Sequence, residues 1–173
     1  MTLTLSDRQL TDPEIDQVHA IVSDWDVVRM LGTWAWPADP VFTRKRMTET
    51  LPDGALTCAA FDRDILCGTG GLMPKGFKSQ DGDRAFWGLM ISRDHRRKGV
   101  AMAIAGNLFD RFFATSDEPV FAQVWGDNAA SHALHRKLGF IETERKTAFH
   151  PVRNADAEDV TYLLTRDAWE ART

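Results

Sequence analysis

The pattern of apolar and polar positions divides the chain into strands and helices, most clearly in its second half. Residues 85–91 (AFWGLMI) are almost wholly apolar, which is typical of a strand covered on both faces. Residues 99–114 predict a helix, because apolar side chains recur there at spacings of three and four and form one wide face: Ala101, Ile104, Ala105, Leu108, Phe109 and Phe112. The same reasoning predicts the other elements of this half: strands over 120–125, 140–149 and 160–164, a helix over 128–138 and a short terminal helix from Asp167.

The first half begins with a short alternating segment at 2–5 and then changes to helical signals. Two helix starts combine an acceptor side chain with a proline: Thr11 or Asp12 stands before Pro13, and Asp39 stands before Pro40. The elements predicted here are helices from about residue 11, over 26–31 and over 39–51, and strands over 55–61 and 65–72 that form a hairpin. We expect a polar loop over 76–83, and Gly88 inside the next strand indicates a bulge or a close backbone approach.

Helices that alternate with strands after a hairpin predict an α/β fold with a mixed central sheet of about seven strands and helices on both faces. The chain of 173 residues is the length of one domain, so we expect a single domain over 1–173. Hydrophobic residues make up 43% and charged residues 27% of the sequence, which excludes a wholly disordered or collagen-like chain.

Charge and cysteine usage limit the classes of function. The net charge of −4 gives no general case for binding nucleic acid. No apolar run approaches the roughly 20 residues that span a bilayer, and the first residues do not resemble a secretory signal. Cys58 and Cys67 are interpreted as free, buried thiols, with a disulfide between them as the less favoured alternative. We therefore expect a cytoplasmic protein with neither a membrane nor a nucleic-acid partner.

The segment ISRDHRRKGVA, residues 91–101, carries the most informative chemistry. A buried strand ends, a basic turn follows and a helix begins near Gly99. The first amides of a helix have no internal partners, and the helix dipole adds positive potential there. Glycine lets a ligand approach the backbone closely. Together with the cationic side chains, these features suit a pyrophosphate. The alternative is a solvated basic turn that happens to precede a helix.

Two sequence blocks together resemble one enzyme family. Arg96-Arg97-Lys98-Gly99-Val100-Ala101 fits the R/Q-x-x-G-x-G/A signature with which GNAT N-acetyltransferases hold the diphosphate of acetyl-CoA. Asn128-Ala129-Ala130-Ser131 and Lys137-Leu138-Gly139-Phe140 resemble the N-x-x-S and K-L-G-F block of the subfamily that acetylates ribosomal-protein N-termini and related amines. The resemblance is strong over residues 84–141 and looser over the rest of the chain.

The resemblance implies a role for each matching residue. The backbone amide of Ile91 would hold the thioester carbonyl and stabilise the oxyanion that forms there. Asn128 would bind the pantetheine arm, and Ser131 would protonate or hydrogen-bond the departing thiolate. From the residues alone, Asn128 is equally a helix N-cap and Ser131 a surface hydroxyl. The residues implied to bind the pyrophosphate are Arg96, Arg97, Lys98, Gly99, Val100 and Ala101.

The sequence departs from the family at Phe86, where related sequences often carry a glutamate that is a candidate general base. The remaining candidates for a base are His95, His132, His135, His150 and Glu142. Only His150, on the predicted loop between the last strands, is expected near an acceptor, whereas solvated roles are expected for His132 and His135. At pH 7 an α-amine is about 10–15% neutral and a lysine only about 0.04%. An enzyme without a base would therefore favour an α-amine.

Trp34 and Trp36 are further candidates for the acceptor side. In the fold that the resemblance implies, the loop between the first helices lines the acceptor groove. Two indoles there would hold an apolar or cationic acceptor by packing and by cation–π contact. The alternative for each is ordinary core packing or a dimer patch.

The sequence thus predicts an acetyl-CoA-dependent N-acetyltransferase in which a primary amine, of a protein N-terminus or a small molecule, attacks the thioester directly. Neither cysteine lies in a motif, so no covalent cysteine intermediate is implied. A non-catalytic acyl-CoA-binding module is the first alternative, and a nucleic-acid binder that uses the basic turn is the second. We expect no metal, because no further ligand cluster joins His132 and His135, and a monomer or homodimer.

Overall fold

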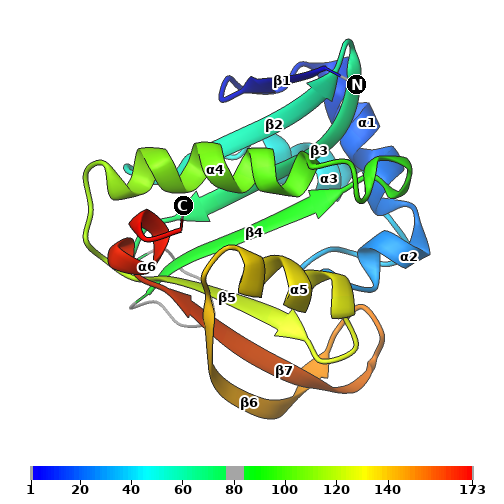
Figure 1. The fold of residues 1–173 in the computed structure, drawn as a ribbon. Coiled ribbons are helices and arrows are strands. Elements are labelled where there is room, and N and C mark those ends of the chain that lie inside the picture. The colour runs from blue at the N-terminus through cyan, green and yellow to red at the C-terminus, as the bar shows by residue number, and fades with distance from the viewer. Residues whose placement is uncertain (1, 77–83, 173) are drawn as a thin grey trace.

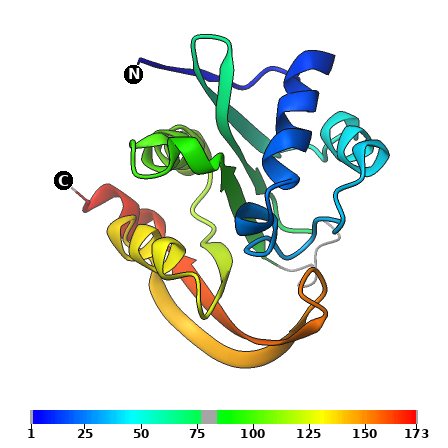
Figure 2. The ribbon, with the colours of Figure 1, turned by 90° about the vertical axis from the view of Figure 1, so that its right-hand side faces the viewer.

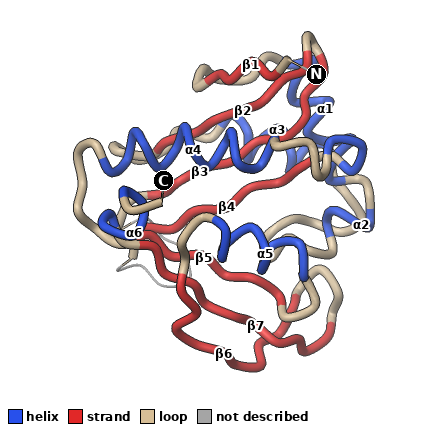
Figure 3. Tube along the Cα trace, viewed as in Figure 1, coloured by secondary structure: helices blue, strands red, loops and turns tan. Residues whose placement is uncertain are grey.

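The computed structural model describes residues 2–76 and 84–172, and a single sheet of seven strands forms its centre (Figures 1 and 3). The strands are β1 (Leu3–Ser6), β2 (Leu56–Asp62), β3 (Ile65–Met73), β4 (Ala85–Ile91), β5 (Val120–Trp125), β6 (Ile141–His150) and β7 (Ala155–Leu164). Their order across the sheet is β1-β2-β3-β4-β5-β7-β6. Within the described chain, β4 and β5 pair in parallel, and every other neighbouring pair is antiparallel.

Helices cover both faces of this sheet, which confirms the predicted fold class. The helices are α1 (Asp12–Val22), α2 (Trp25–Val28), α3 (Pro40–Thr48), α4 (Val100–Phe113), α5 (Ala129–Lys137), α6 (Arg166–Glu170) and the single 3-10 turn η1 (Arg93–His95). Figure 2 views the sheet nearly edge-on, with α1, α2 and α3 on one side and α4, α5 and α6 on the other. The two faces have separate apolar cores.

Strand alternation distributes side chains between the two cores. Successive residues of a strand point to opposite faces, so β4 places Trp87 in the core around α4 and Met90 in the core around α1. The helix signals of the sequence act as predicted at two starts. Asp39 accepts a hydrogen bond from the Val41 amide at 2.8 Å and caps α3, and Glu14 accepts one from the Thr11 amide at 2.7 Å at the start of α1.

Several predicted boundaries are wrong. Helix α2 ends at Val28 rather than at 31, and α3 ends at Thr48 rather than at 51. Strand β7 begins at Ala155 and not at 160. Its first four residues pair only with β6 and form a two-stranded extension of the sheet. The polar side chains of this extension gave no strand signal in the sequence. The β3–β4 ladder continues through Gly88 without a register shift, so the predicted bulge is absent there. The predicted loop lies outside the described residues over 77–83.

Candidate active site

The parallel strands β4 and β5 separate after only two paired positions. Ala85 pairs with Val120, and Phe86 pairs with Phe121. The two strands then continue to Ile91 and Trp125 without pairing further with each other (Figure 1). Backbone groups that leave a ladder need other hydrogen-bond partners. The separated strands therefore offer a ligand the backbone of β4 up to Ile91, which is half-buried at the open end.

The basic turn lies at this open end and leads directly into α4. Gly99 is the N-cap of α4 with φ +83°, and no side chain caps the helix, so its first amides are left for a ligand. A Cβ at Gly99 would meet nothing within 4 Å, so the glycine serves the left-handed backbone and open access rather than packing. Arg97 is also left-handed, with φ +58°. Arg96, Arg97 and Lys98 are exposed around this helix start.

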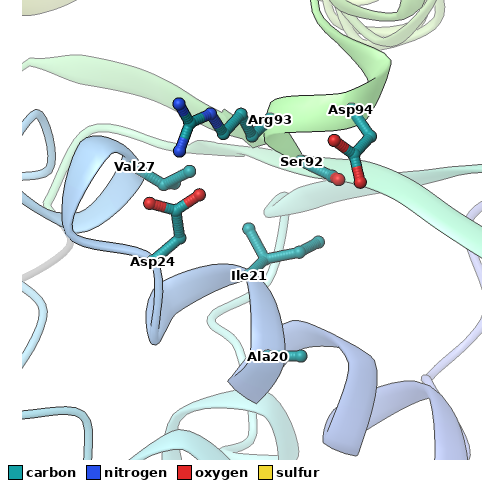
Figure 4. Close-up of a pocket in the computed structure, with 7 residues that line it drawn as sticks. All are labelled: Ala20, Ile21, Asp24, Val27, Ser92, Arg93 and Asp94. Carbon is teal, nitrogen blue, oxygen red and sulfur yellow. The ribbon is translucent and has the colours of Figure 1, made fainter.

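Helix α2 is tied to the turn by charged contacts. Arg96 Nη2 donates to the backbone oxygen of Asp26 at 3.0 Å, and Arg93 Nη1 lies 3.4 Å from its carboxylate. A pocket of about 250 Å³ lies between the turn and helices α1 and α2, and its lining residues are drawn in Figure 4: Ala20, Ile21, Asp24, Val27, Ser92, Arg93 and Asp94. Its apolar lining comes from α1 and α2 and most of its polar lining from the turn, so the pocket connects the basic turn with the α1 face of the sheet.

The N-terminus of α5 carries the second predicted block. Asn128 caps the helix, because its side-chain oxygen accepts a hydrogen bond from the Ser131 amide at 3.2 Å. This confirms the N-cap interpretation, and the NH₂ group of the same side chain remains a donor. Ser131 lies one turn further on, with its Oγ 3.3 Å from Nδ1 of His135.

His132 and His135 are buried, so the expectation of solvated roles is wrong. Their exposed fractions are 7% and 5%. His132 Nε2 lies 3.2 Å from the Gly126 carbonyl oxygen, and its Nδ1 lies 2.8 Å from the Tyr162 hydroxyl. Burial lowers the pKa of His135 to about 4, and the neighbouring His132 adds to the shift. Helix α5 thus turns both imidazoles inward onto the sheet, which its polar sequence did not indicate.

His150 lies on the other face of the sheet, and its predicted loop position is wrong. It is the last residue of β6, is fully buried and stacks on Trp125 with 4.0 Å between ring centroids. Its Nε2 lies 2.8 Å from the Arg29 carbonyl oxygen, which can only accept, so Nε2 carries the hydrogen. Burial lowers the pKa of His150.

The two predicted acceptor-side tryptophans have different environments. Trp34 is buried, contacts Phe42 edge-on and lies beneath the Arg46 guanidinium, so it belongs to the core. Trp36 is 43% exposed and packs against Trp25, the first residue of α2, with 5.0 Å between ring centroids. Of the two, only Trp36 is placed to meet a ligand.

The remaining candidates for a base are distributed around the molecule. His95 Nδ1 lies 3.3 Å from Ser92 Oγ inside the turn, and Glu142 pairs with Arg145 at 2.9 Å on β6. Phe86 is half-buried on the α1 face of β4, because alternation places it opposite Trp87.

The structure adds a buried carboxylate that the sequence prediction missed. Asp159 is 5% exposed and accepts a hydrogen bond from Gln123 Nε2 at 3.1 Å. Their neighbours Val124 and Val160 belong to the α4 core, so alternation points both polar side chains to the α1 face. The signal was the acid directly before the apolar run of β7, which was interpreted as the lead into the last strand and not as part of a site.

An ion-pair network joins three segments on the same face of the sheet. Arg153, in the β6–β7 turn, contacts the Asp127 carboxylate at 2.8 and 3.0 Å, which lowers the pKa of Asp127. Arg153 Nε also donates to the Arg29 carbonyl oxygen at 2.8 Å. These contacts join α2, the β5–α5 loop and the β6–β7 turn, three segments far apart in the sequence.

The described residues give no sign of a metal site or a membrane span. No group of three or more His, Cys, Asp or Glu side chains there could hold a metal ion. No helix in residues 2–76 or 84–172 is long and apolar enough to cross a membrane. Cys58 and Cys67 are both free and buried, as predicted.

A parallel pair that separates in front of an uncapped, glycine-started helix is an arrangement that suits a phosphate-bearing ligand at the helix start. Residues 3–141 match the family model described as an acetyltransferase (GNAT) domain, so the chain belongs to the GNAT acetyltransferase family. The predicted family resemblance is therefore confirmed. A search of curated proteins gave no match.

Solved structures share the fold at low sequence identity. A ribosomal-protein-alanine N-acetyltransferase from Brucella melitensis is 19% identical with a TM-score of 0.75, covering 95% of this chain and 99% of that one. A phosphinothricin acetyltransferase from Sinorhizobium meliloti, solved with acetyl-CoA, is 21% identical with a TM-score of 0.76, covering 95% and 89%. A putative acetyltransferase from Salmonella typhimurium, also solved with acetyl-CoA, is 16% identical with a TM-score of 0.70, covering 96% and 95%.

Proposed function

We propose that the protein transfers the acetyl group of acetyl-CoA to a primary amine, which attacks the thioester directly in a ternary complex. The observation that carries this proposal is the separation of β4 from β5 in front of the uncapped α4 helix start and its three cations. Family membership and neighbours solved with acetyl-CoA support the same cofactor. Acetyl-CoA would be a co-substrate, consumed in each turnover.

On the cofactor side, Arg96, Arg97, Lys98 and the amides of Gly99, Val100 and Ala101 would bind the pyrophosphate. The backbone amide of Ile91 would polarise the thioester carbonyl, and the Asn128 NH₂ group would bind the pantetheine arm. Ser131 would donate a hydrogen bond to the departing thiolate. Full proton transfer from Ser131 is disfavoured, because an aliphatic hydroxyl is about as weak an acid as water, whereas a thiol has a pKa of about 8.5.

On the acceptor side, the amine would approach from the α1 face, past Trp36 and Phe86. His150 is a poor base there, because its Nε2 hydrogen is held by the Arg29 carbonyl oxygen and its Nδ1 is buried. An amine that is already partly neutral at pH 7 is therefore favoured, such as an α-amine with a pKa of about 7.7–8.0. This supports a protein N-terminus or a small amine as acceptor rather than an internal lysine.

One alternative function has a specific observation in its favour. Phe86 stands where related sequences often carry a carboxylate, which suits a module that binds acyl-CoA without catalysis.

We further propose that the protein works in the cytoplasm as a monomer or homodimer. Its two buried free thiols are consistent with a reducing compartment.

A thermal-shift assay followed by an acceptor screen tests the proposal. The melting temperature should rise with excess acetyl-CoA by mass action, and we expect an affinity of about micromolar. Release of free thiol is then measured with alanine-terminated peptides, polyamines, amino-sugar antibiotics and phosphinothricin. The absence of any shift at about millimolar acetyl-CoA would contradict the proposal. Binding without thiol release from any acceptor would favour the non-catalytic module.

A further inference from the structure

The hydrogen-bond partners of His135 fix which of its nitrogens carries the proton. Nδ1 lies 2.8 Å from the backbone oxygen of Ser131, and a carbonyl oxygen can only accept. Nδ1 is therefore the protonated nitrogen of the neutral ring, and Nε2 carries the lone pair. The Ser131 hydroxyl oxygen, 3.3 Å from the same nitrogen, then receives the weaker branch of a shared N–H bond.

This arrangement determines the direction of the Ser131 hydroxyl hydrogen. Because Oγ accepts from the imidazole, its own hydrogen must point away from His135. The contacts of the described residues give that hydroxyl no acceptor. The Ser131 side chain is thus kept as a hydrogen-bond donor toward its surroundings, while its oxygen is polarised by the Nδ1–H group.

The pair lies where β4 and β5 begin to separate. The His135 ring is 5.4 Å from the ring of Trp87, centroid to centroid, and Trp87 directly follows Phe86, the last β4 residue that pairs with β5. Helix α5 runs alongside this region in Figure 1. The hydroxyl of Ser131 therefore stands beside the space into which a thioester bound between the strands would reach.

His135 also has a feature that packing alone does not explain. Its ring is enclosed by aromatic side chains, stacked on Tyr162 at 5.3 Å and edge-on to Phe140 at 4.9 Å. Its Nε2 is buried without a hydrogen-bond partner in the described chain. An unpartnered buried nitrogen is destabilising, and a phenyl ring would fill the same space without one. The useful property of the imidazole is the Nδ1–H group.

We propose that His135 is a positioning residue that orients and polarises the Ser131 hydroxyl so that it donates a hydrogen bond to the sulfur of CoA as the thiolate forms. This inference rests on the proposed acetyl transfer and adds a residue that acts through Ser131. His135 does not itself supply the proton, because burial keeps the ring neutral at pH 7.

The experiment measures the pKa of the CoA thiol bound to the protein, which needs no knowledge of the amine acceptor. Free CoA is bound at saturating concentration, and the ultraviolet absorbance of its thiolate is followed against pH. A hydrogen bond to the charged form lowers a pKa. We expect the bound thiol to have a lower pKa in the wild-type protein than in Ser131→Ala or His135→Phe, by about 0.5 to 1 unit.

Two further variants separate positioning from packing. In His135→Asn, the side-chain amide places an N–H group near the former Nδ1, so the wild-type thiol pKa should be restored. His132→Phe is the matched control, since its imidazole contacts Tyr162 and Gly126 rather than Ser131. It should lower the melting temperature and leave the thiol pKa unchanged. The double variant Ser131→Ala/His135→Phe should equal Ser131→Ala, because His135 acts through the hydroxyl.

Three results would overturn the inference. If CoA binds but its thiol pKa is the same in the wild type, Ser131→Ala and His135→Phe, the inference is wrong and the proposed function stands. If His132→Phe raises the thiol pKa as much as Ser131→Ala does, general packing is responsible and the positioning role is lost. If CoA does not bind to the wild-type protein, the proposed function fails and the inference fails with it.

Discussion

The two faces of the sheet, at the point where β4 and β5 separate, are assembled from very different parts of the chain. The α5 face uses two short segments, the turn over 91–101 and the start of α5 around Ser131. The α1 face combines α2, the loop that carries Trp36, the end of β6 with His150 and the start of the apolar part of β7 with Asp159. The proposed cofactor side is thus local in sequence, and the proposed acceptor side is built from distant segments.

This difference explains why the sequence indicates the cofactor more clearly than the acceptor. A pyrophosphate site needs a helix start, a glycine and cations, which fit within about ten consecutive residues. An acceptor surface depends on which distant loops meet, here through the Arg153–Asp127 ion pair and the Arg29 carbonyl oxygen. Substitutions on each face would show whether the two faces also divide the function.

The largest effect is expected at the helix start. Gly99→Glu places a side chain and a negative charge where the phosphates would lie, at a φ of +83° that side chains rarely adopt. We expect the thermal shift with acetyl-CoA to disappear, a loss of affinity of about 100-fold or more. Gly76→Glu is the matched control, because Gly76 has φ +88° and equally open space but lies outside the turn. Equal loss in both variants would show that the effect is strain.

The next largest effect is expected at Ser131, on the α5 face. Ser131→Ala should lower kcat by about 10- to 100-fold, the value of one hydrogen bond to a developing charge. The KM for acetyl-CoA should change little, because the hydroxyl acts mainly when the thiolate forms. Steady-state kinetics with the best acceptor of the screen measure both constants. An unchanged kcat would make Ser131 a structural residue of α5.

On the acceptor face, the pH profile of kcat/KM should belong to the amine and not to the protein. Without an enzyme base, the rise has its midpoint near the pKa of the acceptor, and an acceptor with a pKa lower by about one unit shifts it down by about one unit. His150→Ala and Asp159→Asn should leave the midpoint in place. A midpoint that ignores the acceptor and is lost in either variant would identify that residue as the base.

The sequence was sufficient for the fold class and for the local structure around the proposed cofactor site, where each element is encoded locally. Gly99, the basic turn and the Asn128 cap lie where the motifs predicted them. The errors at the α5 histidines and at the start of β7 arise from long-range contacts. Imidazoles on the polar helix α5 were expected in solvent, but the sheet encloses them. The residues 155–159 looked like a loop, because pairing with β6 stabilises a strand whose own side chains are polar.

A smaller effect separates the two acceptor-side tryptophans. Trp36→Ala should raise the KM for an apolar or cationic acceptor by about 3- to 10-fold, because an exposed aromatic contact contributes about 0.5–1.5 kcal/mol. Its stability and acetyl-CoA affinity should stay near wild type. Ile65→Ala removes a similarly exposed apolar side chain at the β2–β3 turn and serves as control. If the acceptor KM changes equally in both variants, Trp36 is not part of the acceptor surface.

Acid stability tests the buried His135 on the α5 face of the sheet. The pKa of His135 is lowered by burial from 6.5 to about 4, so between these values the unfolded chain takes up a proton that the folded chain refuses. Stability must therefore fall as the pH falls through this window, by at most about 3 kcal/mol. Glu14, whose pKa is lowered from 4.5 to about 2 by Arg8, loses its stabilising contribution mainly below about pH 4.5. Melting temperatures from about pH 7 to about pH 4.5 should decline less steeply in His135→Phe than in the wild type. A slope that changes only in His150→Phe would place the acid-sensitive group on the acceptor face instead.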